Sequence, residues 1–203
     1  MSGRAYALAL SAIGVWSSLA FLGLRLASVP PFLLVGLALL IGSGCSVHHF
    51  RQWRVSPKLL ALGVYGLFGY HLCFFLALRL APPVEANLMN YLWPLFTVIF
   101  SPWILPGYSL RPHHLGAAFL GMTGAALIVT GGSFVSFRSE FLPGYLLGGG
   151  AAFIWATYSL TTKRLGGFPN AAIGGFCFAS GVLSLLVHVL LEEPYIPTLG
   201  ELP

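Results

Sequence analysis

The chain has 203 residues, of which 57% are hydrophobic and 7% are charged, and its mean hydropathy is +0.86. A soluble domain carries about 25% charged residues, so this composition excludes a soluble globular domain. A disordered chain is excluded as well, because disorder needs low hydrophobicity and high net charge. The apolar runs are long and unbroken, whereas the strands of a membrane barrel alternate apolar and polar residues. The sequence therefore predicts an all-α polytopic membrane protein, with room for about seven spanning helices of ~20 residues.

Acidic residues are scarce. Lys and Arg number 10, Glu numbers 5 and Asp is absent, which gives a formal net charge of +5. Paired carboxylates, Mg²⁺–phosphate sites and an Asp-oriented His all need acids, and five Glu without any Asp leave little for such chemistry. We therefore expect no enzyme activity, no cofactor and no metal. The basic residues lie scattered between apolar segments, so no nucleic-acid partner is expected.

Seven helices are predicted, and Pro or Gly marks the breaks between them. They span residues 6–26, 30–49, 58–80, 84–105, 112–132, 143–165 and 170–191. The first apolar run is too long for the core of a signal peptide. With the N-terminus in the cytoplasm, seven basic residues fall at cytoplasmic ends and three at outer ends, so the positive-inside rule favours that orientation.

Two stretches of the chain share a pattern at a constant offset of 139 residues. The pattern W-x8-R-L-x3-P-x5-G begins at Trp16 and again at Trp155. The copies begin an odd number of helices apart, so they cross the membrane in opposite directions, as in the inverted repeats of secondary transporters. We expect residues 1–135 to form a first five-helix repeat and residues 143–203 to begin a second, inverted one. The second repeat would then be about three helices short of complete.

The fourth segment carries polar and aromatic residues on one helical face. Asn87, Asn90, Tyr91 and Pro94 share this face, and Trp93 borders it. Amides are costly against lipid, so they are expected to point into the bundle or a wet cavity. Hydrogen bonds between helices are the alternative, above all for Asn87. Pro94 lacks an N–H and therefore frees the carbonyl about four residues upstream, near Asn90.

Aromatic residues on two other segments complete a candidate site. In the third segment, His71 is ionisable at mid-membrane, and a satisfied core histidine is the alternative. In the sixth segment, Trp155 and Tyr158 share a stripe that lines a cavity or simply packs, and Trp16 is the repeat equivalent of Trp155. The full set of predicted substrate-binding residues is Trp16, Tyr70, His71, Phe74, Asn90, Tyr91, Trp93, Trp155 and Tyr158.

These residues give the chain a family resemblance. The stretch from Tyr70-His71 to the run N-Y-L-W-P at residues 90–94 resembles the drug/metabolite transporter superfamily of EamA type, and most of all its bacterial aromatic amino-acid exporters. The resemblance implies an inverted-repeat fold of five plus five helices in the inner membrane. It also implies that Tyr70, His71, Tyr91, Trp93 and Trp155 line a central cavity. Position 74 is Phe here, where the exporters carry a hydroxylated aromatic residue.

The sequence thus predicts a secondary transporter that exports aromatic or neutral amino acids, or related small metabolites, by alternating access. Its expected partners are a small-molecule substrate and the lipid bilayer. One alternative is a non-transporting protein or fragment that needs a second copy or another partner to supply helices. A membrane enzyme using His71 or Ser43 is the other alternative, although no nucleophile constellation supports it.

Overall fold

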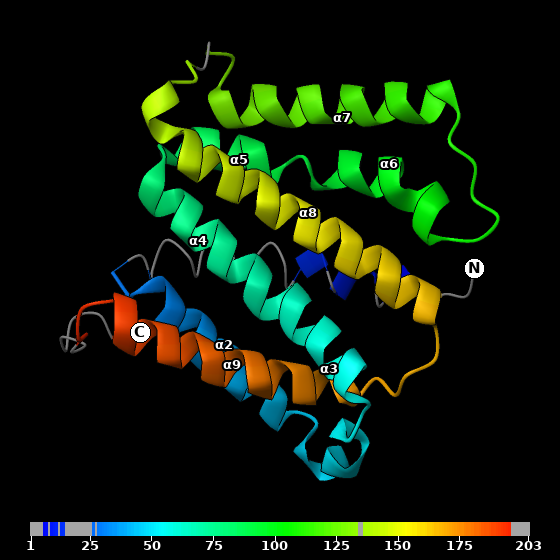
Figure 1. Cartoon of the computed structure of the whole chain (residues 1–203), viewed down its shortest axis with the longest axis vertical. Coiled ribbons are helices and arrows are strands. Elements are labelled where there is room, and N and C mark those ends of the chain that lie inside the picture. Colours follow the sequence, from blue (N-terminus) through cyan, green and yellow to red (C-terminus); the bar gives the residue numbers. More distant parts are fainter. Residues whose placement is uncertain are drawn as a thin grey trace.

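The computed structural model describes residues 6–7, 9–11, 13–14, 26, 28–133 and 136–195, and these residues are helical or lie in turns and loops (Figure 1). The labelled helices are α2 (Pro31–Gly44), α3 (Pro57–Val64), α4 (Tyr70–Leu80), α5 (Pro83–Asn90), α6 (Trp93–Ile104), α7 (Pro112–Thr130), α8 (Leu142–Leu165) and α9 (Ala172–Leu191). Most of the first predicted segment, with Trp16, lies outside the described residues. The later segments confirm an all-helical fold with ends close to those predicted.

Proline begins most of these helices. A proline lies in the first turn of α2, α3, α5, α6, α7 and α8. The first-turn N–H groups of a helix have no partner within it, so the missing N–H of proline costs nothing there. At the other end, α7 stops at Gly131, whose φ of 59° is the left-handed conformation that favours glycine.

The structure differs from the predicted segments at three breaks. The helix predicted over 30–49 ends at Gly44, and the chain bends by 95° into a 3₁₀ helix, η1 (Val47–Trp53). The segment predicted over 58–80 is continuous but contains a π-helical turn, η2 (Tyr65–Gly69). The segment predicted over 84–105 is broken between Asn90 and Trp93, where α5 gives way to α6.

Three described helices are long and apolar enough to cross a membrane: the run Pro57–Leu80, α7 and α9. The bent pair of α2 and η1 becomes a fourth if it is counted as one span. Helices of this length and apolarity agree with a polytopic membrane protein.

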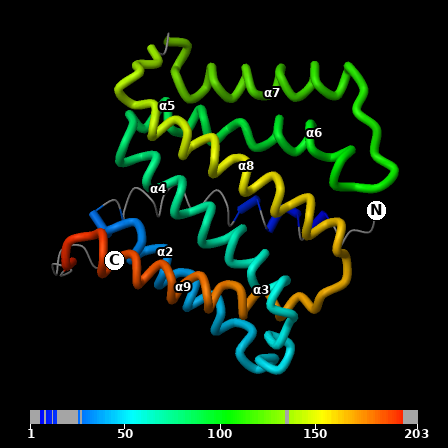
Figure 2. Tube along the Cα trace, in the orientation of Figure 1, coloured from blue at the N-terminus to red at the C-terminus, as the bar shows by residue number. Residues whose placement is uncertain are grey.

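Helix α8 lies between α4 on one side and α5 and α6 on the other, while α2 packs along α9 (Figures 1 and 2). Small residues permit these close contacts. A Cβ added to Gly148 of α8 would lie 2.9 Å from the Ala86 carbonyl oxygen of α5. A Cβ added to Gly181 of α9 would lie 3.0 Å from the Gly36 carbonyl oxygen of α2. Close backbone approach of this kind drives helix association in membranes, where lipid removes the hydrophobic effect between helices.

Candidate substrate-binding site

An aromatic cluster joins α4 to α8. The ring of Tyr70 lies with its centroid 5.3 Å from that of Trp155, and it stacks on Phe74 at 5.9 Å. His71 meets the Tyr70 ring edge-on at 5.1 Å, and Tyr158 extends the cluster from Trp155 at 5.8 Å. The cluster therefore presents ring faces and edges from two helices, an arrangement that suits a flat ligand.

The π-helical turn that precedes Tyr70 packs against Tyr158. Gly66 lies in this turn and is buried against the Tyr158 ring, and a Cβ on Gly66 would collide with that ring. One helical turn earlier, Gly63 meets Phe176 of α9 in the same way. π-helical turns occur mostly as single insertions at functional sites. Here the turn ends immediately before Tyr70 and holds Gly66 against the Tyr158 ring.

Asn90 supplies polar atoms beside the rings. Its Nδ2 donates a hydrogen bond of 3.3 Å to the Tyr70 hydroxyl, which links α5 to α4. Its Oδ1 is buried and has no hydrogen-bond partner. Asn87, by contrast, donates from Nδ2 to the Pro83 carbonyl of its own helix at 2.9 Å.

His71 is tied to its own helical segment. Its Nδ1 lies 2.6 Å from the Leu67 carbonyl oxygen, and its ring also contacts Phe75 at 5.9 Å. The short contact fixes Nδ1 as the protonated nitrogen when the ring is neutral. His71 thus has the partner expected of a core histidine while it touches the Tyr70 ring. A role in substrate binding stays a prediction.

Not all of the predicted site residues gather in this cluster. Tyr70, His71, Phe74, Asn90, Trp155 and Tyr158 are linked by the contacts above. Tyr91 and Trp93 flank the helix break and are 38% and 37% exposed. The role predicted for Tyr91 and Trp93 stays a prediction, as does that of Trp16, which lies outside the described residues.

An ionic cluster that the sequence does not predict joins α4 to the end of α9. Glu192, at the end of α9, has a side chain that is 1% exposed and lies 2.9 Å from Arg79 of α4. It also pairs with His188 at 2.8 Å. The spacing of His188 and Glu192, one helical turn apart, was the available signal, but nothing in the sequence placed Arg79 beside them.

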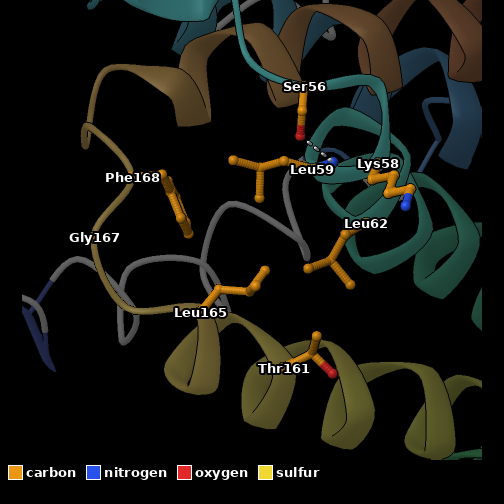
Figure 3. A pocket seen from close by; sticks show the side chains of 8 residues that line it. All are labelled: Ser56, Lys58, Leu59, Leu62, Thr161, Leu165, Gly167 and Phe168. Carbon is orange, nitrogen blue, oxygen red and sulfur yellow. Dashed lines mark hydrogen bonds between the residues drawn. The ribbon is translucent and has the colours of Figure 1, made fainter.

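An open pocket of about 590 Å³ lies beyond the aromatic cluster, between the start of α3 and the end of α8 (Figure 3). Leu62 and Thr161 line it. Leu62 lies about one helical turn before Gly66, and Thr161 lies about one turn after Tyr158. Figure 3 shows Leu59, Leu165 and Phe168 across the same opening. The Gly66–Tyr158 contact therefore lies between this pocket and the rings of Tyr70 and Trp155.

In the described part of the chain, no group of three or more His, Cys, Asp or Glu side chains is placed to hold a metal ion.

Known proteins resemble the chain along nearly its whole length. The sequence profile of the EamA-like transporter family matches residues 3–130. An aromatic amino acid exporter YddG from Ancylobacter novellus is 40% identical over 200 residues, which are 94% of this chain and 69% of that protein. An aromatic amino acid exporter YddG from Salmonella typhimurium is 27% identical, over 70% of this chain and 51% of its own length. An uncharacterized transporter YyaM from Bacillus subtilis is 26% identical, over 100% of this chain and 65% of its own length.

The fold also matches a solved crystal structure with a TM-score of 0.87 and 38% sequence identity, covering 99% of this chain and 72% of that one. The profile covers more than half of the chain, and the Ancylobacter relative shares the sequence on both sides of the helix break. The chain therefore belongs to the EamA-like transporter family of membrane proteins, near its aromatic amino-acid exporters.

Proposed function

We propose that the protein is a secondary transporter that exports aromatic or neutral amino acids, or related small metabolites, across the inner membrane by alternating access. Two relatives are named as aromatic amino acid exporters, and the more similar of them shares 40% of its residues with this chain over the aligned region. We further propose that the N-terminus is cytoplasmic, as the distribution of Lys and Arg favours.

The observation that carries this proposal is the contact between Tyr70 and Trp155, with ring centroids 5.3 Å apart. Flat substrate side chains stack on such rings, and an aromatic pair is worth about 0.5–1.5 kcal/mol beyond its buried area. Asn90 adds an amide at the Tyr70 hydroxyl. The site thus combines an apolar platform with a few polar atoms, as small-molecule sites do.

The packing of α2 on α9 supports alternating access between two inverted units, residues 1–135 and residues 143–203. The 139-residue offset aligns α2 with α9, and Gly42 of α2 with Gly181 of α9. Transport sites lie at the interface between inverted repeats, and both the α2–α9 seam and the α4–α8 contact would join the first unit to the second. The chain spans 69% of the Ancylobacter exporter. A complete pathway would therefore include helices beyond those described, from the same chain or from a partner.

Flux measured in liposomes tests the proposal. The native full-length protein, reconstituted with internal phenylalanine or tryptophan, should release the labelled amino acid faster than empty vesicles. Trp155→Ala should lower this rate about tenfold, because it removes the ring platform. Trp103→Ala is the matched control, since Trp103 is 76% exposed on α6.

Two results would count against the proposal. Equal export rates for Trp155→Ala and Trp103→Ala would refute the assignment of the aromatic cluster as the substrate site. A wild-type protein that inserts normally but moves no amino acid would favour the partner-dependent alternative.

A further inference from the structure

We propose that Asn90, at the break between α5 and α6, accepts hydrogen bonds from the ammonium group of the substrate. The site would thereby bind the free amine of the substrate through uncharged protein oxygens and not through a carboxylate side chain. This inference rests on the proposed function and specifies how its substrate is held.

First, the Asn90 side chain has a hydrogen-bond acceptor that no donor satisfies. A side-chain amide has two N–H donors and one oxygen with two lone pairs. The Nδ2 of Asn90 is used by the Tyr70 hydroxyl at 3.3 Å, while Oδ1 is buried with no partner. Buried polar atoms in folded proteins nearly always find a partner, so an orphaned one calls for a reason. A ligand that brings a donor would satisfy it.

The second step is the helix break itself. In a continuous helix the N–H of residue 94 would bond to the carbonyl of Asn90, but residue 94 is proline and has no N–H. Asn90 is the last residue of α5, and α6 restarts at Trp93. Asn90 therefore offers two acceptors, one from its side chain and one from its backbone. Interrupted helices in transporters use such freed carbonyls to hold positive charge.

The third step is the neighbouring charge. The described acids lie at helix ends or outside helices: Glu85 in the first turn of α5, Glu140 in the turn before α8, and Glu192 and Glu193 after α9. Glu85 is five residues before Asn90 and so faces another side of the helix. A cation beside Asn90 would thus meet neutral oxygens close to the Tyr70 ring, and aromatic rings attract ammonium groups.

The ligand class follows from these three steps. Neutral acceptors do not repel the carboxylate of a zwitterion, which a buried Asp or Glu would do. A flat side chain fits the ring cluster, and an α-ammonium group satisfies Oδ1. An analogue with the same ring and carboxylate but no amine would leave Oδ1 unpaired, and sites built to hydrogen-bond a group reject analogues that lack it.

Competition binding tests the inference on the native full-length protein in detergent, with labelled phenylalanine displaced by unlabelled phenylalanine or by 3-phenylpropionate, which lacks the amine. Wild type should prefer phenylalanine at least about tenfold. Asn90→Leu, which removes the side-chain acceptor at similar volume, should reduce this preference to about threefold or less. Asn87→Leu, the matched control one turn earlier, should keep the wild-type preference.

A preference in Asn90→Leu that equals that of wild type would overturn the inference. If Asn90→Leu does not fold, Asn90→Asp gives a second readout. A carboxylate at this position should raise the affinity for phenethylamine, which carries an amine but no carboxylate, about tenfold. An unchanged phenethylamine affinity in Asn90→Asp would also overturn it. A wild-type protein that binds no aromatic amino acid would contradict the proposed function itself, which is a separate outcome.

Discussion

Arg79 and Glu192 are 113 positions apart in sequence, yet the Arg79 Nη2 lies 2.9 Å from the Glu192 Oε1. The same carboxylate accepts hydrogen bonds from the backbone N–H groups of Phe32 and Leu33, at 3.2 and 3.3 Å, and pairs with His188. Those N–H groups belong to the first turn of α2, which has no side-chain cap of its own. One carboxylate therefore joins the end of α4, the end of α9 and the start of α2.

Replacing Glu192 should weaken the fold. Glu192→Ala removes the cap of α2, which is worth about 1 kcal/mol. It also removes an ion pair whose arginine is 39% exposed and so contributes at most ~1 kcal/mol. We expect the free energy of unfolding to fall by about 2 kcal/mol, measured as a lower thermal midpoint in detergent. Glu193→Ala, at an exposed position next in sequence, should leave the midpoint in place. Equal midpoints for the two variants would show that the cluster does not stabilise the fold.

The contact between Gly66 and Tyr158 should tolerate no added methyl group. Gly66→Ala places a Cβ against the Tyr158 ring, so the ring or the π-helical turn must move. Such overpacking costs about 1–3 kcal/mol. Gly69→Ala is the matched control, since its Cβ would lie 3.7 Å from the Ile154 Cδ1, an ordinary contact.

We expect Gly66→Ala to lower both the thermal midpoint and the rate of phenylalanine export, and Gly69→Ala to change neither by much. A Gly66→Ala protein with wild-type stability and flux would show that Tyr158 can be repositioned freely.

The seam between α2 and α9 gives a third prediction. A Cβ on Gly181 would lie 2.9 Å from the Leu40 Cγ and 3.0 Å from the Gly36 carbonyl oxygen, so Gly181→Ala must push the helices apart. The expected loss is about 1–3 kcal/mol of unfolding free energy. Gly42, the position equivalent to Gly181 in the repeat, has no atom within 4 Å of an added Cβ. Gly42→Ala should therefore be neutral or slightly stabilising, and thermal denaturation of both variants distinguishes them.

The Tyr70 hydroxyl should matter separately from its ring. Tyr70→Phe keeps the contacts with Phe74 and Trp155 but removes the acceptor for the Asn90 Nδ2. A freed amide is poorly oriented, so phenylalanine affinity should fall about fivefold, the effect of roughly 1 kcal/mol. Tyr65→Phe is the control, because it removes a hydroxyl that contacts Thr157 elsewhere on α8. It should leave the phenylalanine affinity, measured by equilibrium binding, unchanged. Equal affinities for Tyr70→Phe and wild type would argue against a positioning role for the hydroxyl.

Much of the fold could be predicted from apolar run length and proline. The helices predicted at 112–132, 143–165 and 170–191 agree with α7, α8 and α9 to within two residues at each end. Long apolar runs have few alternatives in a membrane, where the backbone must satisfy its own hydrogen bonds. The grouping of Tyr70 with Phe74 and of Trp155 with Tyr158 also followed from helical spacing.

The helix break after Asn90 and the Arg79–Glu192 pair could not be predicted, because the spacing of residues along the chain does not reveal contacts between helices. The sequence predicts one continuous helix over 84–105, whereas the structure breaks this segment between Asn90 and Trp93, and Tyr91 and Trp93 beside the break are 38% and 37% exposed. Pro94 predicted the freed carbonyl and not the full interruption. Glu192 is buried and pairs with Arg79 on another helix, and sequence spacing alone does not reveal this pairing.

Locating a bound substrate tests the proposed site directly. Crystals of the native full-length protein grown with 4-bromophenylalanine would reveal the bromine by its anomalous scattering. We expect this signal beside the rings of Tyr70 and Trp155, with the amine toward Asn90. A signal confined to the pocket lined by Leu62, Thr161 and Phe168, with none at the rings, would contradict the assignment of the aromatic cluster as the substrate site.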